Sequence, residues 1–181
     1  MTQFIWPAQF ACTLITENAV LPNSYSISIS IEPIDKQANI ALGFRKLRHF
    51  VENHLHNSVF ICKDNPLAAA LENVENNRVI FPTEPYDYCV GSILYTKFLT
   101  ICDKYFDIEF ITIDSAVGDH VQYTIIDPEE SGLDLEGDHW WNSDTADTGT
   151  GNTMSWKELN IKEGSSFEPT IIQGGLNSKQ S

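Results

Sequence analysis

The sequence predicts a single α+β domain over residues 1–127, followed by an irregular acidic extension over residues 128–181. In the first part, alternating apolar and polar residues indicate antiparallel hairpins and short strands, and apolar residues at steps of three and four indicate about three helices. After residue 127 neither period continues, and the chain becomes rich in Gly, Ser, Thr and Asp. With 181 residues, 42% of them hydrophobic, the chain is long enough to enclose its own core.

A long antiparallel hairpin opens the domain, with strands expected over residues 9–16 and 24–31. In the second stretch, SYSISISI, one tyrosine and three isoleucines alternate with serines. A period of two is typical of a strand with one buried face. The connecting ENAVLPNS contains turn-forming residues, so the two strands are expected to pair directly.

Two helices and two short strands follow. Residues 37–55 carry apolar side chains at helical spacing. A second helix is expected after Asn65, which suits the N-cap, because Pro66 fits the first helical position, where no backbone N–H is needed. The apolar runs at 58–62 and 76–81 are expected to be short strands.

The strongest helix is expected over residues 83–106, as the central helix of the core. Glycine costs a helix about 1 kcal/mol relative to alanine, so we expect close packing against a strand at Gly91. A second hairpin follows, with strands over 107–114 and 120–127. Its inward-facing residues are expected to be Ile108, Phe110 and Thr112 in the first strand and Val121, Tyr123 and Ile125 in the second.

The charge pattern argues against direct nucleic-acid binding. The formal net charge is −14, and the interval between Lys104 and Lys157 holds twelve Asp and Glu residues but no Lys or Arg. Proteins that follow nucleic-acid phosphates need clustered basic side chains. An acidic surface favours a basic protein partner instead.

Two adjacent tryptophans stand in the acidic stretch GDHWWNSDTADTGTG. One interpretation is that the indoles attach the extension to the domain's own surface, with Trp156 as a further anchor, because a buried indole offsets the ordering of several loop residues. The other is that they form the centre of a partner-binding site, toward which nearby carboxylates attract a basic surface. The partner-binding residues predicted on the second interpretation are Trp140, Trp141, Asp138, Asp144 and Asp147.

Motifs for catalysis or metal binding are few. Asp119 and His120, in the turn of the second hairpin, are candidates for acid–base chemistry in a small hydrolase or metal-dependent enzyme, although aspartate is common in turns for structural reasons. A calcium-loop spacing fails in NSDTADTGTGN, because Ala146 and Asp147 stand where a ligand and a glycine are needed. The common nucleotide-binding and hydrolase motifs are not found in the sequence. We therefore expect no cofactor and no metal.

A polar face on the first helix allows two interpretations. Arg45, His49, Glu52 and His56 follow one another at steps of four, three and four. They could form an acid–base or metal-binding face, since histidine serves both purposes near neutral pH. The alternative is a solvated helix surface with one or two ion pairs.

Several features of residues 84–125 occur together in a known group of proteins. They are Glu84–Pro85 at the start of the helix, Val90–Gly91 within it, the LYTKF turn, and Gly118–Asp119 after the next strand. In these features the stretch resembles small uncharacterised accessory proteins of large tailed bacteriophages. The shared features are structural, and the group implies no known activity, so no functional residue carries over.

These observations predict a non-enzymatic, protein-binding accessory factor that acts on a host or viral protein through its acidic, tryptophan-containing segment. The structural alternative is a virion or assembly protein, a homo-oligomer whose tail crosses to a neighbouring subunit. No apolar run reaches the roughly 18–20 residues of a membrane-spanning helix, and the N-terminus lacks the basic region that begins a signal peptide. A cytoplasmic location without membrane contact is therefore expected.

Overall fold

One mixed sheet organises the protein. The computed structural model describes residues 4–34, 39–74, 77–118, 120–152, 154–156, 158–159 and 161. Within these residues the strands are β1 (Phe4–Ile15), β2 (Val20–Pro33), β3 (Ser58–Cys62), β4 (Arg78–Phe81), β5 (Phe106–Ser115) and β6 (Tyr123–Ile125). They are ordered β4-β3-β1-β2-β5-β6. The pairs β1–β2, β2–β5 and β5–β6 are antiparallel, whereas β3 runs parallel to both β1 and β4.

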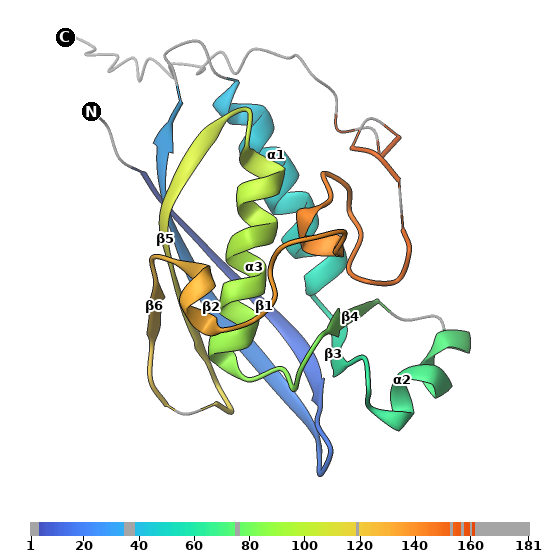
Figure 1. Ribbon diagram of the computed structural model, residues 1–181. Coiled ribbons are helices and arrows are strands. Elements are labelled where there is room, and N and C mark those ends of the chain that lie inside the picture. The colour runs from blue at the N-terminus through green and yellow to red at the C-terminus, as the bar shows by residue number, and fades with distance from the viewer. Residues whose placement is uncertain are drawn as a thin grey trace, which may run out of the picture.

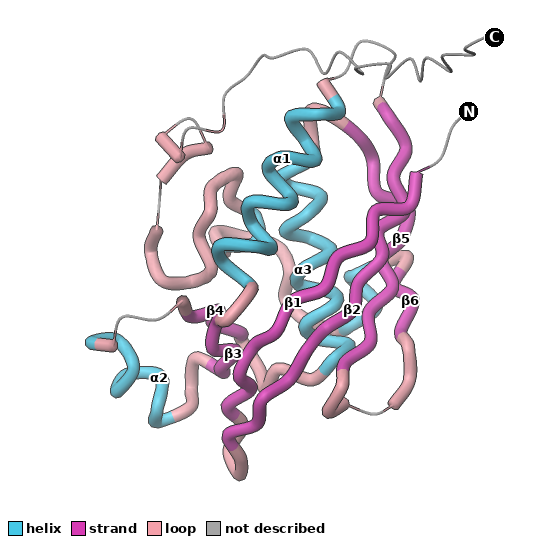
Figure 2. Tube along the Cα trace, turned by 180° about the vertical axis from the view of Figure 1, so that it is seen from behind, coloured by secondary structure: helices cyan, strands magenta, loops and turns pink. Residues whose placement is uncertain are grey.

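The two longer helices cover one face of this sheet. The helices are α1 (Ile40–Phe50), α2 (Pro66–Ala70) and α3 (Asp87–Cys102), with short turns at Val51–Leu55, Leu71–Asn73, Pro128–Ser131 and Trp140–Asn142. Figures 1 and 2 show α1 and α3 against the same face, with α2 set apart beside β3 and β4. The predicted α+β domain with antiparallel hairpins, short strands and three helices is confirmed.

The predicted N-terminal hairpin is confirmed, and the strand order places it in the middle of the sheet. β1 and β2 pair along their whole length, with Phe10 opposite Tyr25. The side chains of Tyr25, Ile27, Ile29 and Ile31 are each exposed by 2% or less. The strict alternation in SYSISISI therefore corresponds to one buried face of β2.

The second hairpin differs from the prediction on both strands. β5 carries a β-bulge: Ile31 of β2 pairs with Ile108 and Ser30 pairs with Phe110, which leaves Glu109 as the extra residue. A bulge reverses the alternation beyond it. Consequently the buried residues of β5 are Phe106, Ile108, Ile111 and Ile113, and the predicted inward positions Phe110 and Thr112 are only half-buried. On the second strand, Val121 precedes β6 and is 48% exposed rather than inward-facing.

The helix expected over residues 37–55 ends in a wider turn. α1 continues at Val51–Leu55 as a π-helical turn, whose extra residue shifts the side chains that follow it. This turn places the ring of His54 against Phe50, with 5.8 Å between ring centroids. The expected polar face is interrupted as well, because His49 is half-buried and packs edge-on against Trp156.

Gly91→Ala is expected to lower the free energy of unfolding by about 1–3 kcal/mol, the usual cost of overpacking a core. A Cβ at this position of α3 would lie 2.5 Å from Ile125 Cδ1 and 2.7 Å from Ile113 Cγ2. At an unhindered helix site the same substitution would stabilise by up to about 1 kcal/mol. The sign of the change in a urea denaturation experiment is therefore decisive, and a gain in stability would contradict the close packing against β5 and β6.

Candidate functional site

The acidic segment, residues 127–152, folds back over α3 and β4 and forms part of the core (Figure 1). Trp140 and Trp141 lie in a 3-10 turn and are only 7% and 3% exposed. Trp140 Nε1 donates a hydrogen bond to the carbonyl oxygen of Ile80 at 2.8 Å, and Trp141 Nε1 donates to that of Leu135 at 3.2 Å. Both indoles therefore dock on the domain itself, in agreement with the first of the two interpretations.

Lys97 of α3 is the second anchor of the acidic segment. Its side chain is fully buried, and Nζ donates to the carbonyl oxygens of Trp140 at 2.8 Å and Ser143 at 2.6 Å. Nearby, Thr100 Oγ1 donates to the carbonyl oxygen of Trp141 at 3.0 Å. Burial lowers the pKa of Lys97 to about 8, against the opposing effect of Asp147 and Asp144. The ammonium is thus still protonated at neutral pH and carries a charge inside the protein.

The position of Lys97 in the sequence already indicates that its side chain is buried. Lys97 lies three residues after Leu94 and four before Ile101, so it occupies a position of the apolar stripe of α3. A lysine at such a position needs an internal partner, because an unpaired buried charge is costly. Which partner it has could not be predicted, since the two carbonyl groups lie more than forty residues further along the chain.

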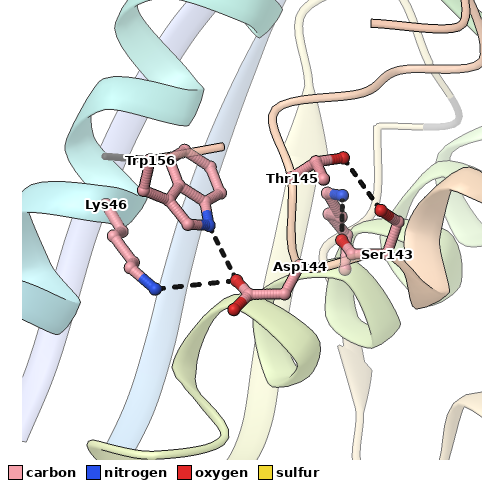
Figure 3. A network of polar contacts seen from close by, with 6 residues as sticks. Lys46, Ser143, Asp144, Thr145 and Trp156 are labelled. Carbon is pink, nitrogen blue, oxygen red and sulfur yellow. Dashed lines mark hydrogen bonds and ion pairs between the residues drawn. The ribbon is translucent and has the colours of Figure 1, made fainter. Parts of the chain in front are cut away.

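Asp144 connects the acidic segment to α1 (Figure 3). Its Oδ1 accepts a hydrogen bond from Trp156 Nε1 at 2.7 Å and lies 3.6 Å from Lys46 Nζ. Lys46 Nζ also lies over the rings of Tyr105 and Trp156, 5.0 and 5.6 Å from their centroids. Asp144 is therefore engaged within the protein, although 44% of its side chain remains exposed.

Asp147 organises the last turn of the acidic segment. Its Oδ1 accepts hydrogen bonds from the backbone N–H groups of Gly149, Thr150, Gly151 and Asn152 at 3.0–3.2 Å. The carboxylate is thus surrounded by donors rather than by the oxygen atoms that calcium requires. In the described ranges, no three His, Cys, Asp or Glu side chains are grouped closely enough to hold a metal ion.

Five carboxylates of the acidic segment, between residues 129 and 138, are exposed to solvent. We call Glu129, Glu130, Asp134, Glu136 and Asp138 the acidic ridge; all five residues are exposed. Among the residues that the structure describes, none of the five forms an ion pair. Of the predicted partner-binding residues, only Asp138 belongs to this ridge, since the tryptophans, Asp144 and Asp147 have internal contacts.

The candidate catalytic pair remains a prediction. Asp119 lies outside the described residues. His120 is exposed, and its backbone has a φ of +56°. This left-handed conformation is uncommon for residues other than glycine and is typical of a tight turn.

The acid stability of the protein is expected to depend on His54. Burial, reinforced by His49 and Lys97, lowers the pKa of His54 to about 4. The unfolded chain therefore binds a proton near pH 6.5 that the folded protein does not accept until about pH 4, so stability falls as pH decreases through this interval. After allowance for solvent screening the loss is on the order of 1 kcal/mol. In denaturation experiments at pH 7 and pH 5, His54→Gln should reduce the difference in stability between the two pH values; an unaltered difference would contradict the assignment.

Comparison with protein-family models and with curated proteins gives no match to this chain. The structure itself defines the class: an α+β protein with a six-stranded mixed sheet and an acidic segment packed on its helical face. No helix in the described part of the chain is both long and apolar enough to cross a membrane.

Proposed function

We propose that the protein is a non-enzymatic binding factor whose acidic ridge docks on a basic surface of a protein partner. One observation carries the proposal: five exposed carboxylates, which form no ion pair with any residue that the structure describes, belong to a segment that Trp140, Trp141 and Lys97 anchor to the domain. No Lys or Arg occurs between residues 104 and 157 to neutralise the ridge along the chain.

Anchoring the ridge favours binding. A flexible acidic tail loses conformational freedom when a partner orders it, and this loss weakens the complex. The acidic segment is already ordered by its buried side chains, so its carboxylates keep their relative positions before contact. Exposed charges of one sign on an ordered segment increase the rate of association with an oppositely charged surface and select against acidic partners.

The resemblance of residues 84–125 to bacteriophage accessory proteins supports a host or viral protein as the partner. Exposed carboxylates gathered on one segment carry the same sign of charge as nucleic-acid phosphates, so the basic cleft of a nucleic-acid-binding protein suits the ridge. In that case the affinity for the partner should fall steeply as the salt concentration rises. A host-cytoplasmic site of action belongs to the same proposal.

The experiment compares two variants that each lose four negative charges. The ridge variant carries Glu130→Gln, Asp134→Asn, Glu136→Gln and Asp138→Asn. The matched control carries Glu17→Gln, Glu52→Gln, Asp64→Asn and Glu72→Gln, four exposed residues on other elements. Proteins captured from host extract are identified and purified, and their affinity for each variant is then measured between about 50 and 200 mM salt.

The ridge variant should lose binding by tenfold or more, at about 1.4 kcal/mol per factor of ten, while the control retains it. Equal affinity of both variants for the purified partner would exclude the ridge as the docking surface. Affinity that does not change with salt would exclude mimicry of nucleic-acid phosphates.

A further inference from the structure

Two adjoining clefts lie where the acidic segment meets β3 and β4. The first, of about 480 Å³, has Lys63, Arg78 and Glu72 among its lining residues. The second, of about 270 Å³, is lined mainly by apolar surface that includes Pro82, His139 and Trp141. Lys63, Ile80 and Gly149 border both clefts, so the two adjoin, and we call them together the double cleft.

The first cleft holds two cations without carboxylate partners. Within the described residues, neither Lys63 nor Arg78 forms an ion pair. Arg78 Nη1 makes one long hydrogen bond, 3.4 Å to the carbonyl oxygen of Ala68, and its buried Nε has no hydrogen-bond partner. In a chain with only 11 Lys and Arg and a net charge of −14, two uncommitted cations around one cleft favour an anionic ligand.

The acidic groups of the double cleft leave room for such an anion. Glu72 and Asp138 are exposed, as Lys63 is, so water screens these three charges, whereas Arg78 is half-buried. Asp147 also lines the second cleft, but its Oδ1 is held by four backbone N–H groups. Exposed charges elsewhere on the protein are screened beyond about 8 Å at physiological ionic strength.

The second cleft offers flat, rigid walls. His139 stacks on Trp141 with 4.4 Å between ring centroids and 25° between ring planes. Gly149 has a φ of +89°, and a Cβ there would lie 2.8 Å from Ile80 Cβ, so the backbone itself forms this border. Phe81 and Pro82 place the cleft at the carboxyl end of β4, and Lys63 directly follows β3. The carboxyl ends of parallel strands are the usual position of ligand sites in α/β sheets.

We propose that the double cleft binds a small molecule in which a planar ring carries an anionic group, a phosphate or a carboxylate. The anionic group lies between Lys63 and Arg78, and the ring packs in the second cleft against Pro82 and the stacked His139. A nucleoside monophosphate and an aromatic carboxylate share this chemistry. The site shares Asp138 with the edge of the acidic ridge, but its proposed ligand contacts, Lys63 and Arg78, lie outside the ridge, so it does not depend on the proposed protein partner.

The test is an NMR titration of the whole isotope-labelled protein with four probes: adenosine monophosphate, adenosine, inorganic phosphate and phenylacetate. Adenosine monophosphate or phenylacetate should bind saturably and shift the amide signals of Gly149 and Thr150. The other pair of probes separates the contributions, because adenosine has the ring without the anion and phosphate has the anion without the ring. Each should bind about tenfold more weakly or worse, as expected when one charge-assisted contact or the ring contact is lost.

Lys63→Gln is the main variant, because Lys63 is exposed and its removal leaves the fold intact. It should weaken binding of the anionic probes about tenfold, and Arg78→Gln should act in the same direction. Lys104→Gln, an exposed lysine outside the double cleft, is the control and should have no effect. The proposal is overturned if neither ring-bearing anion binds at about 10 mM, because a dissociation constant in the mM range is already weak. It is also overturned if Lys63→Gln leaves the affinity unchanged. A third contrary result would be that phosphate alone binds as tightly as the better ring-bearing anion.

Discussion

Replacement of Lys97 by methionine is expected to lower the free energy of unfolding by about 2–4 kcal/mol. The variant leaves the carbonyl groups of Trp140 and Ser143, which Nζ now bonds at 2.8 and 2.6 Å, without a donor in a buried position. Methionine fills most of the same volume, so the loss reports the hydrogen bonds rather than a cavity. The measurement is chemical denaturation at pH 7, where the ammonium is protonated because its pKa is about 8.

Lys104→Met is the matched control, since Lys104 lies just beyond α3 and is exposed. Surface substitutions of this kind usually change stability by no more than about 0.5 kcal/mol. If Lys97→Met were as stable as the control, the buried lysine would not be an anchor of the acidic segment.

Trp141→Ala is expected to have the largest effect, about 3–5 kcal/mol, which is typical for truncating a buried aromatic side chain. The indole packs against Trp140 and His139, at 5.5 and 4.4 Å between ring centroids, and its N–H is bonded to Leu135. We expect the acidic segment to detach before the sheet unfolds, because the loss of Trp141 removes one of the side chains that anchor this segment, whereas the pairing of the strands is unaffected. Limited proteolysis should then cut within residues 127–152 of the variant under conditions that leave the wild-type protein intact.

Trp6→Ala provides the comparison. Trp6 is only partly buried on β1, so its replacement should lower the free energy of unfolding clearly less. Equal losses from the two substitutions would mean that Trp141 has no special place in the core. Since the buried Trp141 anchors the segment that carries the ridge, its removal should also reduce partner binding indirectly. The ridge variant with four carboxylates neutralised is therefore the cleaner test of binding.

Much of the fold could be predicted because the signals are local. The alternation around Ile27 and Ile29 requires only that one face of a strand be buried, and the cap at Asn65 involves the backbone N–H of Leu67, two residues away. Gly91 was expected to mark close packing against a strand, and it lies against Ile113 and Ile125. Each of these inferences depends on neighbours in sequence or on burial in general, not on a particular distant partner.

The candidate site was only partly predictable. The sequence indicated an acidic, tryptophan-containing segment and left open whether the indoles face inward or toward a partner. Burial in the structure decides for the inward orientation, and it moves the candidate binding surface from Trp140 and Trp141 to the acidic ridge. The double cleft had no signal at all, because Lys63, Arg78 and His139 are brought together only by the sheet and the folded-back segment.

The sequence by itself determined the strands, the helices, the net charge and the lack of basic residues around the acidic segment, since composition and period are properties of the chain. Only the tertiary structure decided where the β5 bulge falls, to which carbonyl groups Lys97 donates hydrogen bonds, and which carboxylates of the acidic segment are exposed. The physical reason is that three-dimensional proximity selects the partner of a polar group: a buried ammonium or indole N–H donates to whichever acceptor the packing brings within about 3 Å.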